Sequence, residues 1–79
     1  MITYITKETF EKEVLQSPLP VVLDFYASWC GPCAAQGKIL EEMDEKYQGV
    51  IKICKCNVDE NESFAEEFGF DTIPTLLFY

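Results

Sequence analysis

The stretch Val21–Cys33, VVLDFYASWCGPC, decides the fold expected for this chain. Its first part, residues 21–27, is almost continuously apolar and suits a strand buried on both faces of a parallel sheet. Helical spacing then begins at Cys30 or Pro32 and continues to Tyr47. The two cysteines therefore lie at a strand-to-helix junction, where the helix start stabilises an anion such as a thiolate. This position favours a working redox pair over a structural staple.

Further elements extend outward from this stretch on both sides. A β-like run at residues 2–5 and an amphipathic helix at about 7–16, with Thr6 as its N-cap, come before it. A second buried strand at 50–58, a short helix and a last strand at 76–79 come after it. The order β-α-β-α-β-α-β predicts one α/β domain over the whole chain, with at least one right-handed parallel crossover. The apolar positions expected at helical spacing are Phe10, Val14 and Leu15, then Ile39, Leu40, Met43 and Tyr47, then Phe64, Ala65 and Phe68.

Composition and charge exclude several classes of function. The chain has 79 residues, is 48% hydrophobic and has a formal net charge of −8, with six Lys, no Arg and no His. Phosphate binding needs cationic contacts, so neither nucleic acid nor an anionic membrane surface is expected as a partner. Without His, Cys-His and Ser-His activation of a nucleophile are closed.

The expected compartment is the cytoplasm. The first residues, MITYITKETF, have neither a basic leader nor an apolar signal core, and no apolar run approaches the roughly 20 residues of a membrane span. In a reducing cytosol a persistent structural disulfide is not expected. A CxxC pair there is more consistent with redox or metal chemistry.

Taken together, VVLDFYASWCGPC and the segment IPTLLFY, residues 73–79, resemble the thioredoxin family in the expected order along residues 1–79. The resemblance implies a thioredoxin-like fold, with a central mixed sheet flanked by helices. It also implies a thiol-disulfide oxidoreductase that reduces protein disulfides, supports electron transport and cell redox homeostasis, and needs no bound cofactor. Disulfide-containing target proteins and a thioredoxin reductase are the partners it implies.

The resemblance also assigns roles to particular residues. Cys30 resembles the exposed nucleophile, Cys33 the resolving cysteine, and Asp24 a buried carboxylate that handles the proton of the second thiol, with Lys55 near it. Burial should raise the pKa of Asp24, which suits that role. Pro74 matches the cis-proline of the family. The residues expected to contact substrate are Trp29, Gly31, Pro32, Thr72, Ile73 and Pro74.

Each assignment has a plainer alternative. The CxxC pair could be half of a zinc site, although no metal is expected. Asp24 could be a satisfied turn or edge residue, Lys55 a strand lysine with its ammonium in water, Trp29 a packing residue, and Pro74 an ordinary trans proline.

The end of the chain departs from the family, which continues with another strand and a final helix. Leu76 to Tyr79 would then form an exposed apolar sheet edge, and one face of the sheet would lose its covering helix. A fragment, an oligomer paired through the last strand, and a compact variant are the three explanations. We favour a fragment or an edge-paired oligomer. The same edge motivates an alternative function, a redox-inactive binding or assembly module.

Three further departures lie inside the chain. Gly37 and Lys38 replace the small residue and proline that commonly kink the active-site helix, so this helix should be straighter or looser. Tyr26 replaces a second tryptophan. Cys54 and Cys56 are additional and share one strand face, which favours two small core residues over a four-thiolate metal site with Cys30 and Cys33.

Overall fold

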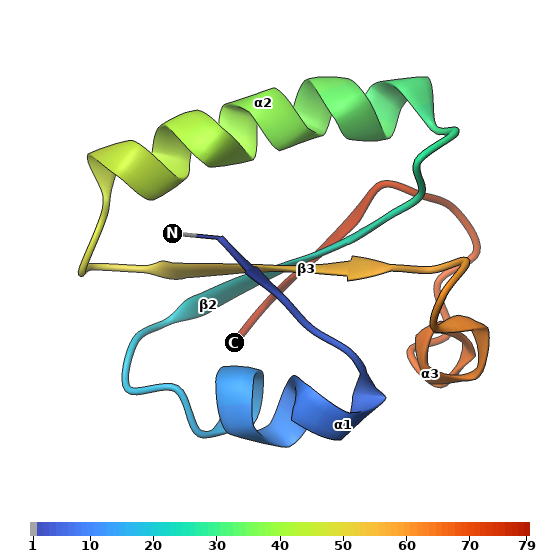
Figure 1. The fold of residues 1–79 in the computed structure, drawn as a ribbon, viewed down its shortest axis with the longest axis horizontal. Helices are drawn as coiled ribbons and strands as arrows, with labels where there is room; N and C mark the ends of the chain where they lie inside the picture. The colour runs from blue at the N-terminus through green and yellow to red at the C-terminus, as the bar shows by residue number, and fades with distance from the viewer. Residues whose placement is uncertain (1) are drawn as a thin grey trace.

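The computed structural model describes residues 2–79, which form a four-stranded mixed sheet with helices on both faces (Figure 1). The strands are β1 (Thr3–Tyr4), β2 (Val21–Tyr26), β3 (Lys52–Asn57) and β4 (Thr75–Phe78). The helices are α1 (Lys7–Phe10), which continues as the wider π-helical turn η1 (Glu11–Leu15), then α2 (Gly31–Lys46) and α3 (Glu62–Glu66). The predicted order of strands and helices is confirmed. Within residues 2–79, no helix combines the length and the apolar character that crossing a membrane requires.

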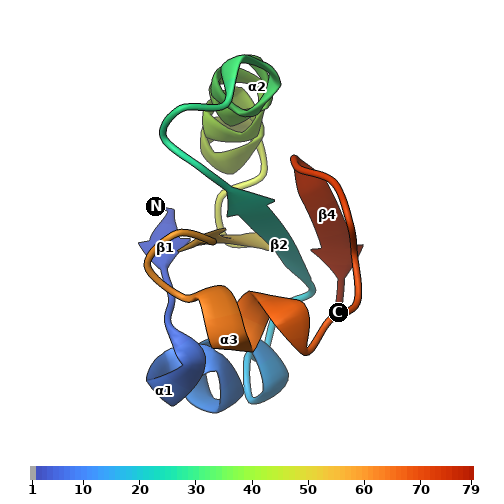
Figure 2. The same ribbon diagram turned by 90° about the vertical axis from the view of Figure 1, so that its right-hand side faces the viewer.

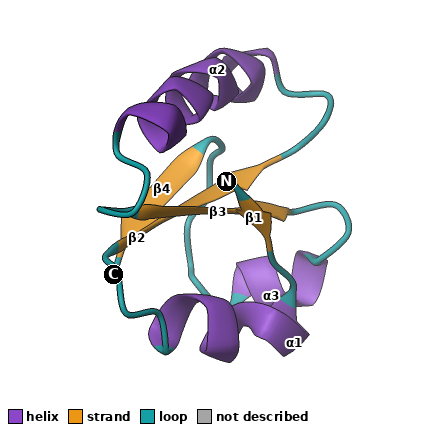
Figure 3. Ribbon diagram, turned by 60° about the vertical axis from the view of Figure 1, so that its left-hand side comes forward, coloured by secondary structure: helices purple, strands orange, loops and turns teal. Residues whose placement is uncertain are grey.

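The strands follow the order β1-β3-β2-β4 across the sheet. β1 and β2 pair in parallel with β3, and β4 pairs antiparallel with β2. In this register Asp24 on the central strand β2 lies between Lys55 on one side and Leu76 on the other. Figure 2 shows α2 on one face of the sheet and α1 with α3 on the other, and Figure 3 shows the strands as the layer between them.

The face covered by α1 and α3 holds an aromatic core. Phe25 is fully buried, and its ring centroid lies 4.9 Å from those of both Phe68 and Phe70. Phe10 and Phe64 join the same cluster, with centroids 5.2 Å apart. Such edge and tilted ring pairs add to the free energy of burying apolar area. This face therefore contributes much of the stability of a small domain.

The face covered by α2 holds a smaller apolar cluster and the polar pair of Asp24 and Lys55. Leu40 is 1% exposed and packs with Val22 and Ile53. The stripe predicted for α2 is partly wrong, because Ile39 is 52% exposed and Tyr47 39%. The buried positions of α2 are Cys33, Gly37 and Leu40, so the helix turns one large apolar residue and two small ones toward the sheet.

Two other sequence expectations need correction. Leu15 is 55% exposed, although Val14 beside it is buried as predicted, so the inward stripe of the first helix is narrower than expected. The strand predicted at 50–58 is β3, which begins only at Lys52. Val50 is 61% exposed and lies in the turn after Gly49. Gly49 and Gly69 follow the ends of their helical segments, with φ of 81° and 75°, a region that favours glycine.

β4 is one of the two edge strands of the described sheet, and β1 is the other. Phe78 is 74% exposed, whereas Leu76 and Leu77 are half-buried. Leu76 packs against the cluster of Val22, Leu40 and Ile53 beneath α2. Of the four residues predicted to form an exposed apolar edge, only Phe78 and Tyr79 are exposed.

Candidate active site

The two cysteines form a disulfide where the chain passes from β2 into α2. Cys30 is the N-cap residue of α2, and its Sγ accepts a hydrogen bond of 3.2 Å from the backbone N–H of Cys33. The two Cα atoms lie 5.2 Å apart. Pro32 lies in the first turn, where backbone N–H groups have no intrahelical partner, so its missing N–H costs no hydrogen bond there. A thiolate at Cys30 would thus meet a backbone donor and the positive end of the helix dipole.

The cysteine at the nucleophile position, Cys30, is less accessible than the resemblance implied. Cys30 is 7% exposed and Cys33 is 3% exposed, so Cys30 is the more accessible of the two but is not an exposed residue in the disulfide form. The reason is local packing: Ala27, Tyr26 and Ile73 lie in one cluster with the disulfide. A target must therefore approach Cys30 at the mouth of this cluster.

Asp24 is buried beneath α2, on the same face of the sheet as the disulfide. Its exposed fraction is 0%, and within residues 2–79 neither carboxylate oxygen has a hydrogen-bond partner. The Nζ of Lys55 lies 3.9 Å from Oδ2. Burial raises the pKa of Asp24 above its ordinary value, an effect that the nearby Lys55 ammonium partly opposes. The alternative of a satisfied turn or edge residue is wrong, since β2 is a central strand.

The Lys55 side chain lies next to Asp24 and lines a hollow between α2 and β3. Its role near Asp24 and the alternative of a strand lysine whose ammonium reaches water both stay predictions. Its side chain is 12% exposed, and Nζ lies 4.5 Å from the centroid of the Tyr26 ring. An ideal Cβ on Gly37 would lie 3.3 Å from the same Nζ. Gly37 therefore leaves the space that the Lys55 ammonium occupies between α2 and β3.

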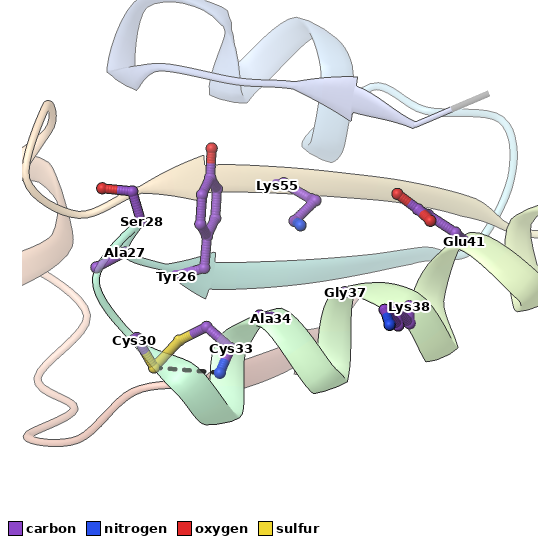
Figure 4. Close-up of a pocket in the computed structure, with 10 residues that line it drawn as sticks. All are labelled: Tyr26, Ala27, Ser28, Cys30, Cys33, Ala34, Gly37, Lys38, Glu41 and Lys55. Atoms are coloured by element: carbon purple, nitrogen blue, oxygen red, sulfur yellow. Dashed lines mark hydrogen bonds between the residues drawn. A yellow bond between two sulfur atoms is a disulfide. The ribbon is translucent and has the colours of Figure 1, made fainter.

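A hollow of about 240 Å³ runs from the disulfide along α2 to this ammonium (Figure 4). Its walls are Tyr26, Ala27, Ser28, Cys30, Cys33, Ala34, Gly37, Lys38, Glu41 and Lys55. The hollow brings the sulfur atoms and the Lys55 cation to one space.

Trp29 and the loop before β4 lie on the other side of the disulfide. Trp29 is 70% exposed, so it is not a core packing residue, and its Nε1 donates a 2.6 Å hydrogen bond to Asp59 Oδ2. The Ile73–Pro74 peptide bond is cis, as the resemblance implied. Ile73 packs against the disulfide cluster. A second hollow of about 240 Å³ is lined by Trp29, Val58, Phe70, Asp71, Thr72 and Ile73.

Cys54 and Cys56 lie on the opposite face of the sheet from the disulfide. Both are free thiols with 0% exposure, and they belong to the cluster that contains Phe25. Burial raises the pKa of both thiols, that of Cys56 to about 11. The prediction of two small core residues is confirmed. Among residues 2–79, no group of three or more His, Cys, Asp or Glu side chains is placed to hold a metal ion.

Sequence reasoning missed the residues that hold Trp29 in place. Asn57 Oδ1 accepts hydrogen bonds from the backbone N–H groups of Asp59 and Glu60, at 2.9 and 3.2 Å. This turn carries Asp59 to the Trp29 indole. The sequence signal was Asn57, because an Asn side chain readily accepts a hydrogen bond from the backbone N–H two residues on and so favours such a turn.

A disulfide of a CxxC pair at a helix N-terminus, beside a buried carboxylate and an α/β sheet, defines a dithiol–disulfide oxidoreductase. The family model described as Thioredoxin matches residues 1–79. The chain belongs to the thioredoxin family.

Curated relatives named thioredoxin match nearly the full length of the chain. The "Thioredoxin" of Rickettsia felis is 42% identical over 79 residues, which are 100% of this chain and 75% of the relative. The "Thioredoxin 1" of a Nostoc species is 44% identical over 75 residues, which are 95% of this chain and 70% of the relative. The "Thioredoxin" of Pseudomonas aeruginosa is 41% identical over 78 residues, which are 99% of this chain and 72% of the relative.

Proposed function

We propose that this chain is a thioredoxin-type reductase of protein disulfides that acts through Cys30 and Cys33. The Cys30 thiolate attacks one sulfur of a target disulfide and forms a mixed disulfide, and the other target sulfur leaves as a thiolate. The Cys33 thiolate then attacks Cys30 Sγ, which releases the second target thiolate and closes the Cys30–Cys33 disulfide. Two electrons pass to the target, and two protons complete its thiols. The observation that carries this proposal is the hydrogen bond from the Cys33 N–H to Cys30 Sγ at the helix start.

Asp24 and Lys55 supply the proton chemistry of the second step in this proposal. Cys33 must lose its proton before it can attack the mixed disulfide. A buried carboxyl with a raised pKa accepts a proton readily, and Asp24 meets that condition. The Lys55 ammonium, 3.9 Å away, stabilises the charged form of Asp24 and so opposes part of the rise in the pKa of Asp24.

Target segments dock between Trp29 and the loop that contains Thr72, Ile73 and Pro74 in this proposal. Gly31 and Pro32 complete the docking surface because both are exposed at the start of α2 beside Cys30. Ile73 supports it from within, since it packs against the disulfide cluster.

The protein works in the cytoplasm as one domain and is recharged by a thioredoxin reductase, in the same proposal. The buried free thiols of Cys54 and Cys56 suit a reducing compartment. The partners are then target proteins that carry disulfides, without a bound cofactor.

Reduction of insulin disulfides driven by dithiothreitol tests the proposal, with Cys30→Ser as the control. We expect catalysis from the chain and none from Cys30→Ser, because serine cannot form the mixed disulfide. Circular dichroism is recorded on both proteins. The proposal would be contradicted if the folded chain reduced insulin no faster than dithiothreitol alone. Equal reduction rates for the wild type and Cys30→Ser would contradict it as well.

A second candidate is a binding or assembly module that pairs through β4, either with another copy or with another chain. The observation that favours it is the exposed Phe78, 74% accessible, on an edge strand of the described sheet. Sedimentation equilibrium of the chain and of Phe78→Lys tests it. A dimer that dissociates in the Phe78→Lys variant supports pairing at β4, whereas a monomer at all concentrations contradicts pairing between copies.

A further inference from the structure

Two hollows on the Trp29 side of the disulfide share lining residues and together form a groove. The first is the hollow of about 240 Å³ beside Trp29 and Ile73 that was described above. The second, of about 320 Å³, extends along α3, and both hollows share Val58 and Phe70. Val58 and Ile73 also pack against the disulfide cluster, so the groove starts next to Cys30. We call the surface formed by Trp29, Val58, Phe70 and Ile73 the groove floor.

The groove floor is bordered by side chains of one charge. Asp59, Glu62 and Glu66 line the hollow along α3, and Asp71 lines the hollow beside Trp29. These four residues are exposed. Residues 56–79 contain six Asp and Glu and neither Lys nor Arg, so this segment supplies no cation to balance them.

The contacts of these four carboxylates do not neutralise their negative charge. Asp59 accepts a hydrogen bond from the neutral Trp29 indole at 2.6 Å, which orients the carboxylate without neutralising it. Lys7 lines a neighbouring hollow together with Asp59 and Glu62. The ion pair that it makes is with Glu67, at 3.4 Å, and Glu67 does not line either hollow of the groove. Both of its side chains are more than half exposed, so solvent screens the pair.

We propose that the groove selects target segments in which the reducible cysteine is flanked by an apolar residue and by Lys or Arg. This inference rests on the proposed reductase function and names its substrate class. The groove floor takes the apolar side chain, and the acidic border attracts the cations of the same segment. A charged border of one sign raises the association rate of oppositely charged partners by about 10- to 1,000-fold and repels partners of the same charge. Segments flanked by Asp or Glu are therefore poor targets.

Two synthetic peptides of equal length test the preference. Each contains one internal disulfide with a Leu beside it, and they differ only in two flanking residues, Lys-Lys in one and Glu-Glu in the other. The prereduced chain is mixed with each peptide, and the reduced peptide is quantified by chromatography after acid quenching. We expect the second-order rate constant to be at least about 10-fold higher for the Lys peptide at low ionic strength. The ratio should fall toward one near 1 M salt, where the Debye length is about 3 Å.

Two variants with the same change of net charge locate the effect. The groove variant carries Glu62→Gln, Glu66→Gln and Asp71→Asn. The matched control carries Glu11→Gln, Glu42→Gln and Glu45→Gln, three exposed positions that line none of the hollows described above. We expect the groove variant to lose most of the preference and the control to keep most of it.

The outcomes separate this inference from the reductase function. Equal rate constants for the two peptides, or an equal loss of preference in both variants, would overturn the groove inference while insulin reduction still supports the reductase. A faster reaction of the Glu peptide would overturn it as well. Absence of reduction for both peptides and for insulin would instead contradict the reductase function on which the inference rests.

Discussion

Cys54 and Cys56 lie on the face of the sheet covered by α1 and α3, whereas Cys30 and Cys33 lie on the face covered by α2. The first pair is held in a fully buried aromatic core where burial raises the thiol pKa, that of Cys56 to about 11. The second pair begins a helix, and Cys30 Sγ already accepts a backbone N–H. The same residue type is therefore placed to be inert on one face and reactive on the other.

The polar groups of the interior follow the same division. Asp24 and Lys55 are direct neighbours across β2 and β3 and point to the α2 face. Their strand neighbours Phe25, Cys54 and Cys56 point to the other face and are all 0% exposed. Alternation along a strand thus separates a layer that stabilises the fold from a layer that carries the chemistry.

Cys33→Ser gives the largest expected effect on this comparison. The Cys30 thiolate can still attack, but the mixed disulfide has no resolving thiol, so catalytic turnover is lost and the target stays attached. Mass spectrometry of the chain after incubation with a disulfide peptide detects the adduct. Cys56→Ala is the matched control on the other face and should turn over normally. Normal turnover of Cys33→Ser would end the assignment of two steps to this pair.

Phe25→Ala tests the stabilising face. Removal of this fully buried ring should reduce the free energy of unfolding by about 3–5 kcal/mol, because apolar burial and ring contacts are lost. Phe78→Ala, a matched change at a residue that is 74% exposed, should change it by no more than about 0.5 kcal/mol. Urea unfolding followed by circular dichroism measures both. Similar losses for the two variants would contradict the division between the faces.

Asp24→Asn tests the chemical face through pH. The folded pKa of Asp24 is raised, so the folded state binds more protons than the unfolded state between the two pKa values. The contribution of Asp24 to the free energy of unfolding of the wild type is therefore greatest below its unfolded pKa. This contribution is lost as pH rises through its folded pKa.

The asparagine variant lacks this loss, so its stability relative to the wild type should increase as pH rises. Urea unfolding at a series of pH values from about 3.5 to 8 measures the difference between the two proteins. Because the lowered pKa of Glu13 is common to both, its opposite effect cancels in that difference. A difference that stays constant with pH would refute a raised pKa at Asp24.

Gly37→Ala gives the smallest expected effect. Helix propensity favours alanine by about 1 kcal/mol, but the new Cβ would lie 3.3 Å from Lys55 Nζ and displace it. We expect a net gain below about 1 kcal/mol in the wild type and a larger gain in a Lys55→Ala background. A double-mutant cycle by urea unfolding measures the difference. Equal gains in the two backgrounds would show that Gly37 makes no special room for Lys55.

Most of the fold could be predicted from the sequence because its local signals agree. The apolar run at 21–27 and the helical spacing that follows it both pointed to the observed elements β2 and α2. The inward face of α2 could not be predicted in this way. Ile39 is more apolar than Gly37, yet Gly37 faces the sheet because Lys55 occupies the space beside it.

The candidate site was predictable where residues lie in one segment and less so where distant segments meet. The cysteine pair and the buried state of Asp24 followed from VVLDFYASWCGPC itself. The bond from Trp29 to Asp59 joins residues 30 positions apart, and no periodicity in either segment encodes it. The low exposure of Cys30 likewise depends on Ile73, which the fold brings in from far along the chain.

The rate of alkylation at each cysteine tests the central claim most directly. The reduced, folded chain is treated with iodoacetamide at a series of pH values, and mass spectrometry of peptides gives the rate at each site. We expect Cys30 to react first, at pH values below the ordinary thiol pKa of about 8.5, and Cys54 and Cys56 to stay unmodified until the chain is unfolded. Modification of Cys54 or Cys56 in the folded chain as fast as Cys30 would contradict it.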